Sequence, residues 1–250
     1  MHTEVFERWI ATVETRHLAE RTFQEVSRSL RSLSSAYVER RTTLAEGAAL
    51  SGAGKRAAFA LFYGPLHFLL VRHIAASLPD AGRVTGPLTD LGCGTGASGA
   101  AWASVCARAP SVVGIDRHPW AVDESRHTYR MFGLKGRTHV GDASRVALAG
   151  RGAVLAAFTL NEMAAGARDG MQSRLLAHAE RGGAVLIVEP LAGFVAPWWN
   201  RWRQAFESAG GRADEWRVRA ELPPIVQKLD RAAGLNHREI TGRSLWLAGD

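Results

Sequence analysis

Cysteine and lysine are scarce in this sequence. Cys93 and Cys106 are the only cysteines in 250 residues and form no Cys-x-x-Cys pair, which excludes a disulfide framework and a four-cysteine metal site. We therefore expect a protein of the reducing cytoplasm that holds no metal. Of the 31 basic residues, only three are lysines. The arginines suit phosphate recognition, because a guanidinium group can bind two oxygens at once, but a genome rich in arginine codons explains them equally well.

Long apolar runs and targeting segments are lacking as well. Three glutamates interrupt the first 14 residues before any apolar run, so neither a signal peptide nor an acid-poor transit peptide is expected. The most apolar stretch, residues 57–78, contains Gly64, Pro65 and Arg72, which indicates core helices and not a membrane span. The net charge of +7 is spread along the chain without a basic tail. A globular protein without a membrane partner is the expectation.

The first 80 residues have the apolar spacing of amphipathic helices, with repeats at i, i+3, i+4 and i+7. The two stripes consist of Phe6, Trp9, Ile10 and Val13, and of Phe23, Val26, Leu30, Leu33 and Tyr37. Gly47, Gly52 and Gly54 mark a break before a third helical region, which Gly64-Pro65 should kink or divide. Residues 1–80 are therefore expected to form an N-terminal helical cap.

Beyond Pro87, short apolar runs alternate with amphipathic segments. The expected strands are Leu88–Leu91, Ser111–Ile115, Thr138–Val140, Ala153–Thr159, Ala184–Val188 and Glu239–Leu247. The expected helices include Ala97–Arg108, Pro119–Phe132 and Pro224–Ala233. Strand, helix and strand repeated at this length predict an α/β fold with a doubly wound, Rossmann-like parallel sheet, which residues 81–250 would form as a second domain.

A glycine-rich turn follows the first of these strands. The sequence DLGCGTG, Asp90 to Gly96, leads from the strand directly into a helix. Its glycines permit positive φ and a close approach of the backbone to a ligand, and the helix N-terminus offers free N–H groups. The spacing is G-x-G-x-G, whereas dinucleotide enzymes use G-x-G-x-x-G. Asp116 ends the second strand, 24 residues after Gly92, so a ligand is predicted on this turn.

Two polar residues, Asn161 and Glu162, end the apolar run that begins at Ala153. Burying an unpaired amide or carboxylate costs several kcal/mol, so the pair must reach solvent or serve a site. In a doubly wound sheet, ligands lie beyond the carboxyl ends of the strands, and this pair stands at that edge. Alternatively, Asn161 caps the following helix and Glu162 favours its positive end. Both interpretations can hold at once.

The stretch Asp90–Gly96 resembles the first motif of the class I S-adenosylmethionine-dependent methyltransferases. The resemblance implies S-adenosylmethionine as the cofactor, with Asp116 on the ribose hydroxyls, Asp142 on the adenine amine and Asp90 near the methionyl ammonium, directly or through water. The implied cofactor-binding residues are Asp90, Gly92, Cys93, Gly94, Gly96, Asp116, Arg117, Asp142 and Ala143.

Asn161 and Glu162 are then the candidate catalytic residues. The side-chain carbonyl of Asn161, the backbone carbonyl of Leu160 or the carboxylate of Glu162 could hold the N–H bonds of an exocyclic amine and localise its lone pair. Glu162 could instead act as a general base for a hydroxyl. Cys93 lies in the glycine loop and Cys106 in the next helix, so methylation of a pyrimidine carbon through a cysteine nucleophile is not expected.

Segments further along the chain resemble the small-ribosomal-subunit methyltransferase family of bacteria and mitochondria. They are FTLNEM, VLIVEPLAGF at Val185–Phe194, the arginine-rich helix beginning at Pro197, the closing GRSLWL and, more weakly, YVERR at Tyr37–Arg41. The resemblance implies RNA or the small ribosomal subunit as the partner and an RNA amine as the acceptor. The family's metal-binding cysteine cluster is absent, so its metal is not carried over. Leu191-Ala192 stand where the family tends to have Gly-Thr, so the family's substrate contacts are left open for this chain.

Three hypotheses about the function remain open, and two of them differ in the molecule that accepts the methyl group. The tryptophans and arginines of Pro197–Phe206 could stack on RNA bases and hold phosphates, although an amphipathic helix with its tryptophans in the core explains the same pattern. A small-molecule acceptor would be favoured if apolar residues of the helical cap lined an enclosed pocket. A non-catalytic ribosome assembly factor that binds S-adenosylmethionine is the third hypothesis.

Overall fold

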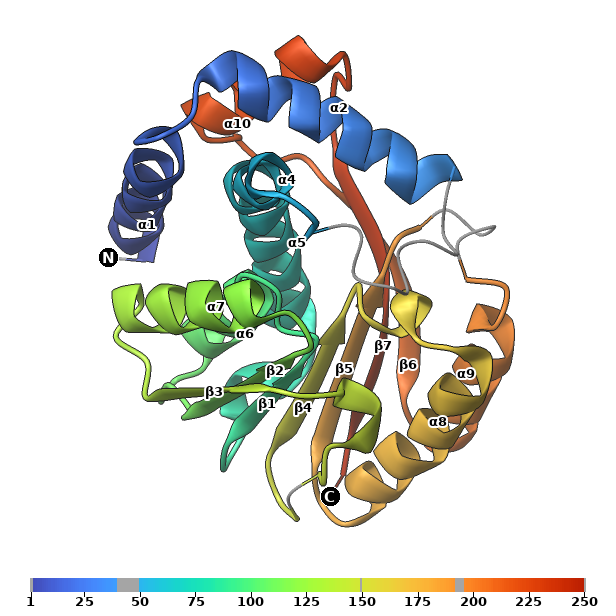
Figure 1. Ribbon diagram of the computed structural model, residues 1–250. Helices are drawn as coiled ribbons and strands as arrows, with labels where there is room; N and C mark the ends of the chain where they lie inside the picture. Colours follow the sequence, from blue (N-terminus) through green and yellow to red (C-terminus); the bar gives the residue numbers. More distant parts are fainter. Residues whose placement is uncertain (1, 40–49, 149, 192–195, 250) are drawn as a thin grey trace.

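The structure is a computed structural model that describes residues 2–39, 50–148, 150–191 and 196–249 (Figure 1). Three sequence features discussed above lie outside these residues, namely Gly47, Arg40-Arg41 of YVERR and Ala192–Phe194 of VLIVEPLAGF.

A seven-stranded sheet has the order β3-β2-β1-β4-β5-β7-β6. Its strands are β1 Leu88–Leu91, β2 Val112–Asp116, β3 Gly136–Val140, β4 Ala153–Ala157, β5 Ala184–Glu189, β6 Arg212–Val218 and β7 Ile240–Ala248. Strands β1 to β5 are parallel, and β7 lies antiparallel between β5 and β6. Because β1 pairs with β2 on one side and β4 on the other, the strand order reverses there, which is where doubly wound folds bind ligands. The predicted Rossmann-like sheet is confirmed.

Helices cover both faces of the sheet. They are α1 His2–Leu18, α2 Phe23–Glu39, α4 Ala53–Ala58, α5 Gly64–Ser77, α6 Ala97–Val105, α7 Pro119–Met131, α8 Ala165–Glu180, α9 Trp199–Ser208 and α10 Pro224–Ala233. In Figure 1, α5, α6 and α7 lie on one face and α8 and α9 on the other, while α1, α2 and α10 arch over the first layer.

Alternate residues of the central strands enter two separate cores. Leu155 and Val188 join the core beneath α5 and α6, whereas Val154 and Ile187 join the core beneath α8 and α9. Because successive side chains of a strand point to opposite faces, a strand covered on both sides reads as one continuous apolar run. The helices of the first 80 residues share the first core, and a domain boundary at residue 80 remains a prediction.

The tryptophans of Pro197–Phe206 are not available to RNA. Trp198, Trp199 and Trp202 are 7%, 6% and 0% exposed and pack in the core between α9 and the sheet. The prediction of a base-stacking surface on this segment is therefore wrong, and the alternative of a core amphipathic helix is confirmed. The helical period brings the three rings to one side of the segment, and burying that apolar area outweighs exposing it.

Strand β6 was not predicted, because its sequence lacks the apolar pattern of a strand. It carries four charged residues, Arg212, Asp214, Glu215 and Arg217, within seven positions and lies at the sheet edge. Charged side chains are a common protection of edge strands against pairing with another chain, and they remove the apolar signal on which strand prediction depends.

The long helix over the sheet contains a π-helical turn. Residues Phe59–Tyr63, labelled η2, join α4 to α5 without a break, and Gly64-Pro65 follows directly. Proline lacks an N–H, and its ring crowds the carbonyl four residues earlier, a conflict that a wider π-turn accommodates. The predicted kink thus takes the form of a bulge. By length and composition alone Ala53–Ser77 would suit a membrane span, but 67% of its apolar window is buried inside the protein, as in a core helix.

Helix α1 is fastened to α7 by a buried carboxylate. Glu124 is 2% exposed and accepts hydrogen bonds from both terminal nitrogens of Arg16, at 2.9 and 3.0 Å, and lies 3.3 Å from Nε2 of His17. The indole N–H of Trp9 donates to Thr128 at 3.1 Å. These contacts hold the helical cap in place.

Removing Arg16 should destabilise the protein in a pH-dependent way. Burial raises the pKa of Glu124, but the hydrogen bond from His17 and the charges of His17 and Arg16 bring it below its ordinary value of 4.5. A carboxyl whose pKa is lower in the folded state stabilises above its unfolded pKa, and this stability is lost as the pH falls through the folded pKa. We expect Arg16→Met to lose about 2 kcal/mol at pH 7, below the usual cost of breaking a buried pair because Arg16 is part exposed. Urea unfolding at pH 7 and pH 4 measures the free energy of unfolding. The exposed Arg8→Met is the control. Equal losses of unfolding free energy in the two variants at pH 7 would refute the expectation.

Candidate active site

A cavity of about 370 Å³ opens where the strand order reverses. Its walls come from the carboxyl ends of β1, β2 and β4, from the segment after β3, and from the α4–η2–α5 helix. Of the predicted site residues, those that line it are Gly92, Cys93, Gly94, Asp116, Arg117, Ala143, Asn161 and Glu162. Residues over 20 positions apart in sequence therefore meet in one site, as the switch-point rule predicts.

Two glycines of the loop occupy positions that disfavour a side chain, Gly92 by crowding and both by their backbone conformation. Gly92 and Gly94 have φ values of +63° and +51°, in the left-handed region that favours glycine. A Cβ on Gly92 would lie 2.4 Å from Oγ1 of Thr159, and one on Gly94 would lie 3.4 Å from the ring of Phe59. Thr159 also donates its hydroxyl to the carbonyl of Leu91 at 2.9 Å, so the end of β4 holds the loop from behind.

Asp116 connects this loop to the end of β2. Its Oδ2 accepts the Gly94 N–H at 3.0 Å, and its Oδ1 accepts the His118 N–H at 2.8 Å. A carboxylate oxygen has two lone pairs, so each oxygen can accept one further donor from the cavity. This geometry fits a ligand that carries two neighbouring hydroxyls, such as a ribose.

Asp90 points away from the cavity. It is 1% exposed, and its Oδ2 accepts the Gly99 N–H at 3.1 Å and the Tyr129 hydroxyl at 2.8 Å. Burial raises its pKa to about 7. The carboxyl thus fastens α6 and α7 behind the glycine loop, and the implied contact with a methionyl ammonium remains a prediction.

Asp142 and Gly96 also lie off the cavity wall. The Oδ1 of Asp142 accepts the backbone N–H and the hydroxyl of Ser144, at 2.9 and 2.7 Å, which lowers its pKa. Asp142 therefore acts as a turn residue, while its neighbours Gly141 and Ala143 reach the wall. Its implied adenine contact is untested. Gly96 precedes α6 with a φ of +75° and shapes the turn.

Asn161 is held by a carboxylate from the neighbouring strand. Oε1 of Glu189 accepts the backbone N–H groups of Leu160 and Asn161 at 2.9 and 3.3 Å, and Oε2 accepts the side-chain N–H of Asn161. Because the carboxylate takes the amide nitrogen, the amide oxygen must face the other way. Among the described residues this buried Oδ1 has no hydrogen-bond partner, and Asn161 lines the cavity. An unpaired buried acceptor costs free energy, which a donor from a ligand would offset if the Asn161 side chain turned this oxygen towards the cavity.

Glu189 is a site residue that the sequence interpretation missed. It is fully buried, and burial raises its pKa to about 8 even though the N–H groups of Asn161 and Leu160 lower it. Across the sheet it faces Arg243 on β7, whose guanidinium lies 4.3 Å from the Trp199 ring. The sequence contained a signal for this residue. Glu189 is the polar residue that ends the apolar run VLIVE, just as Asn161 and Glu162 end the apolar run that begins at Ala153.

Neither Asn161 nor Glu162 caps the following helix. Residues Leu160–Glu162 form a short 3-10 turn, and α8 begins later, with Ala164 as its N-cap and no side-chain capping bond. The helix-cap interpretation is therefore wrong. Glu162 is part buried at the cavity wall, and burial, with the nearby charge of Asp116, raises its pKa to about 7 against the lowering charge of Arg117.

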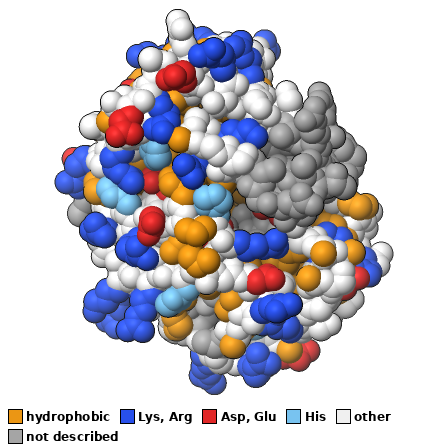
Figure 2. All heavy atoms as spheres, viewed as in Figure 1, with side chains coloured by type: hydrophobic (Ala, Val, Ile, Leu, Met, Phe, Trp, Pro, Cys, Tyr) orange, Lys and Arg blue, Asp and Glu red, His pale blue; other side chains and the backbone are white. Residues whose placement is uncertain are grey.

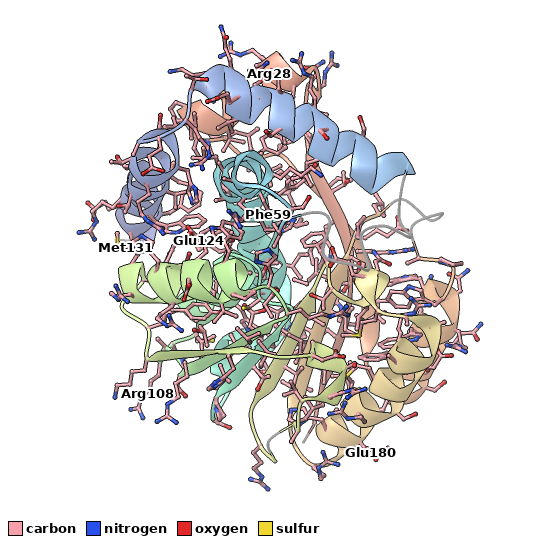
Figure 3. The ribbon with its side chains drawn as sticks, viewed as in Figure 1. Arg28, Phe59, Arg108, Glu124, Met131 and Glu180 are labelled. Atoms are coloured by element: carbon pink, nitrogen blue, oxygen red, sulfur yellow. The ribbon has the colours of Figure 1, made fainter. Side chains whose placement is uncertain are left out.

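An aromatic wall of four side chains, Phe59, Tyr63, His67 and Phe158, forms another side of the cavity. Phe59 is labelled in Figure 3, where the helix approaches the central strands. His67 stacks on Phe158 with ring centroids 4.0 Å apart and planes at 18°. Burial lowers the pKa of His67 to about 3, so its ring is neutral. The sequence analysis did not single out these rings, although the spacing of four residues places 59, 63 and 67 on one helix face.

The cysteines lack the properties of a nucleophile. Cys93 is 5% exposed, and burial raises the pKa of its thiol well above the ordinary value, so the reactive thiolate is disfavoured. Within the described ranges, no three His, Cys, Asp or Glu side chains gather as metal ligands would.

No protein-family profile and no curated protein matches the sequence. Among solved structures, the mitomycin 7-O-methyltransferase MmcR is similar with a TM-score of 0.54 and 13% identity, over 96% of this chain and 72% of its own. The magnesium protoporphyrin IX methyltransferase of Synechocystis PCC 6803, solved with S-adenosylmethionine bound, has a TM-score of 0.48 and 16% identity, over 74% of this chain and 80% of its own. The RNA methyltransferase candidate PH1948 of Pyrococcus horikoshii has a TM-score of 0.47 and 18% identity, over 73% of this chain and 83% of its own. The strand order and the similarity to MmcR over 96% of this chain show that this chain has the Rossmann-like fold found in the class I methyltransferases.

Proposed function

We propose that the protein is an S-adenosylmethionine-dependent methyltransferase. The observation that carries the proposal is the Asp116 carboxylate, which accepts the Gly94 N–H of the glycine loop and has acceptor capacity left towards the cavity. Asp116 would hold the ribose hydroxyls, and the loop would hold the methionyl part. The bound cofactor supplies a methyl group on a positively charged sulfur.

The chain's own residues would position the acceptor for in-line attack, and positioning alone can supply much of the rate. Asn161 lines the cavity, and its buried Oδ1 has no partner among the described residues; the side chain would turn this oxygen towards the cavity to accept an N–H or O–H of the acceptor. Glu162, with a pKa near 7, can take the proton that the acceptor loses. Both residues stand on the same turn after β4.

The acceptor suggested by the sequence resemblance is an amine of RNA, ribosomal in the first place. On the coloured part of the face in Figure 2, Lys and Arg side chains are scattered, so this face gives no support to a basic stripe of the kind that binds RNA. One observation favours a small-molecule acceptor. Leu50, Phe59 and Tyr63 of the N-terminal region line the cavity, so the helical cap contributes apolar residues to it, as expected for a small acceptor.

Transfer of labelled methyl groups tests the function. Purified protein is given labelled S-adenosylmethionine and three pools, namely small ribosomal subunits, free RNA and a metabolite extract. Label in the metabolite pool supports the small acceptor, and label in RNA supports the resemblance. If no pool is labelled although the cofactor binds, the non-catalytic assembly factor is the better account.

A pH profile tests the role of Glu162. Its pKa of about 7 means that the carboxylate form predominates only above neutral pH. We expect kcat/KM to rise with pH through about 7 and Glu162→Gln to lose this rise together with about 100-fold in rate, the usual worth of a general base. Glu180→Gln, on the exposed end of α8, is the control. A Glu162→Gln profile that keeps the same rise would assign the proton transfer to another group.

A further inference from the structure

The cavity has two chemically distinct halves. One half consists of the glycine loop and Asp116, which offer backbone N–H groups and a carboxylate. The other half is the aromatic wall, whose rings form one continuous set of contacts. The ring centroid of Phe59 lies 5.8 Å from that of Tyr63 and 6.0 Å from that of His67, and the centroids of His67 and Phe158 are 4.0 Å apart. The aromatic half has no part in the cofactor contacts proposed above.

The rings of this wall are held in place by the backbone. Phe158 has a φ of +58°, a conformation that costs a bulky residue free energy and persists only where the surroundings enforce it. Its N–H donates to the Val188 carbonyl at 2.7 Å, which locks the end of β4 onto β5. The π-helical turn sets Phe59 and Tyr63 on the facing side. Such π-turns are frequent at functional sites.

The wall is also uncharged. His67 is neutral at physiological pH, since burial lowers its pKa to about 3. Of the described residues that line the cavity, Arg117 alone is a Lys or Arg, and it follows β2 on the cofactor half. A phosphate-bearing ligand would therefore find no counter-charge at the rings. Flat apolar faces pack well on such a surface, because aromatic pairs stack or meet edge to face.

The aromatic wall and the polar residues Asn161 and Glu162 line the same cavity. We propose that the methyl acceptor is a small, uncharged aromatic molecule that carries an N–H or O–H group. Its ring packs on the wall of Phe59, Tyr63, His67 and Phe158, and its N–H or O–H meets the side chains of Asn161 and Glu162. This inference rests on the proposed function and names its substrate class.

Binding of two matched probes tests the inference without requiring turnover. We would titrate 2-naphthol and its saturated analogue decahydro-2-naphthol, which share the hydroxyl but not the flat ring, into protein loaded with S-adenosylhomocysteine. We expect 2-naphthol to bind at least about tenfold more tightly. His67→Leu should weaken 2-naphthol about tenfold, and His67→Phe, which keeps a stacking ring, should restore it.

The same titrations separate the two levels of the proposal. Equal affinity for the flat and the saturated probe, on the unsubstituted protein, overturns the aromatic acceptor whether or not the variants fold. Methyl transfer to RNA that 2-naphthol does not inhibit overturns it as well, while leaving the proposed function intact. Failure of S-adenosylhomocysteine to bind at all contradicts the proposed function itself.

Discussion

Replacing Gly94 by arginine should abolish cofactor binding and leave the fold intact. Gly94 has a φ of +51° and faces the cavity, and a Cβ there already lies 3.4 Å from the ring of Phe59. The longer arginine side chain would extend into the space above the loop. We expect the affinity for S-adenosylhomocysteine to fall at least about 1000-fold, or about 4 kcal/mol, as measured by titration calorimetry.

The control for this variant is Gly133→Arg. Gly133 also has a positive φ, of +67°, but no atom lies within 4 Å of a Cβ placed there, and it follows α7 away from the cavity. Both variants carry similar backbone strain, of about 1 to 3 kcal/mol, and should melt a few degrees below the unsubstituted protein. Only Gly94→Arg should lose the ligand. Unchanged affinity in Gly94→Arg would sink the assignment of the loop.

Replacing Asn161 by alanine should remove methyl transfer without removing cofactor binding. Asn161 lines the cavity, its buried Oδ1 has no partner among the described residues, and Glu189 orients its side chain. Losing one pre-positioned hydrogen-bonding group in an active site costs about 10²- to 10³-fold in kcat. The variant leaves one oxygen of the buried Glu189 short of a donor, so a stability loss of about 1 to 3 kcal/mol should accompany the change.

The exposed Asn200→Ala, on α9, is the matched control and should behave as the unsubstituted protein does. Initial rates at saturating cofactor, together with calorimetry of S-adenosylhomocysteine, separate the two effects. A rate within about threefold of the control would show that Asn161 does not position the acceptor. Loss of cofactor affinity in parallel with the rate would place Asn161 in the cofactor site instead.

The sheet could be predicted because its central strands are buried on both faces. Ala153–Ala157 and Ala184–Val188 are continuous apolar runs, and such runs can be recognised from the chain alone. Edge strand β6 could not be predicted, since its four charged residues leave no apolar signal. The tryptophans of α9 show a related difficulty, because sequence cannot decide whether an aromatic stripe meets the core or a ligand.

Site residues could be predicted where they lie at or just after the carboxyl end of a single predicted strand. Gly94, Asp116 and Asn161 were found in this way, and they meet in one cavity. The Asp90 carboxyl points into the core because it accepts a hydrogen bond from the hydroxyl of Tyr129, 39 residues away. No local sequence pattern reveals this pairing. The aromatic wall joins His67 to Phe158, which sequence places far apart, and Glu189 acts through the N–H groups of Leu160 and Asn161 on the neighbouring strand end.

A crystal structure with S-adenosylhomocysteine tests the central claim most directly. The account predicts that the ribose hydroxyls meet Asp116, that the methionyl part lies on Gly92–Thr95, and that the sulfur faces the turn of Asn161 and Glu162. Density for the ligand elsewhere, or none in this cavity at millimolar ligand, would contradict the assignment of the site and with it the proposed methyl transfer.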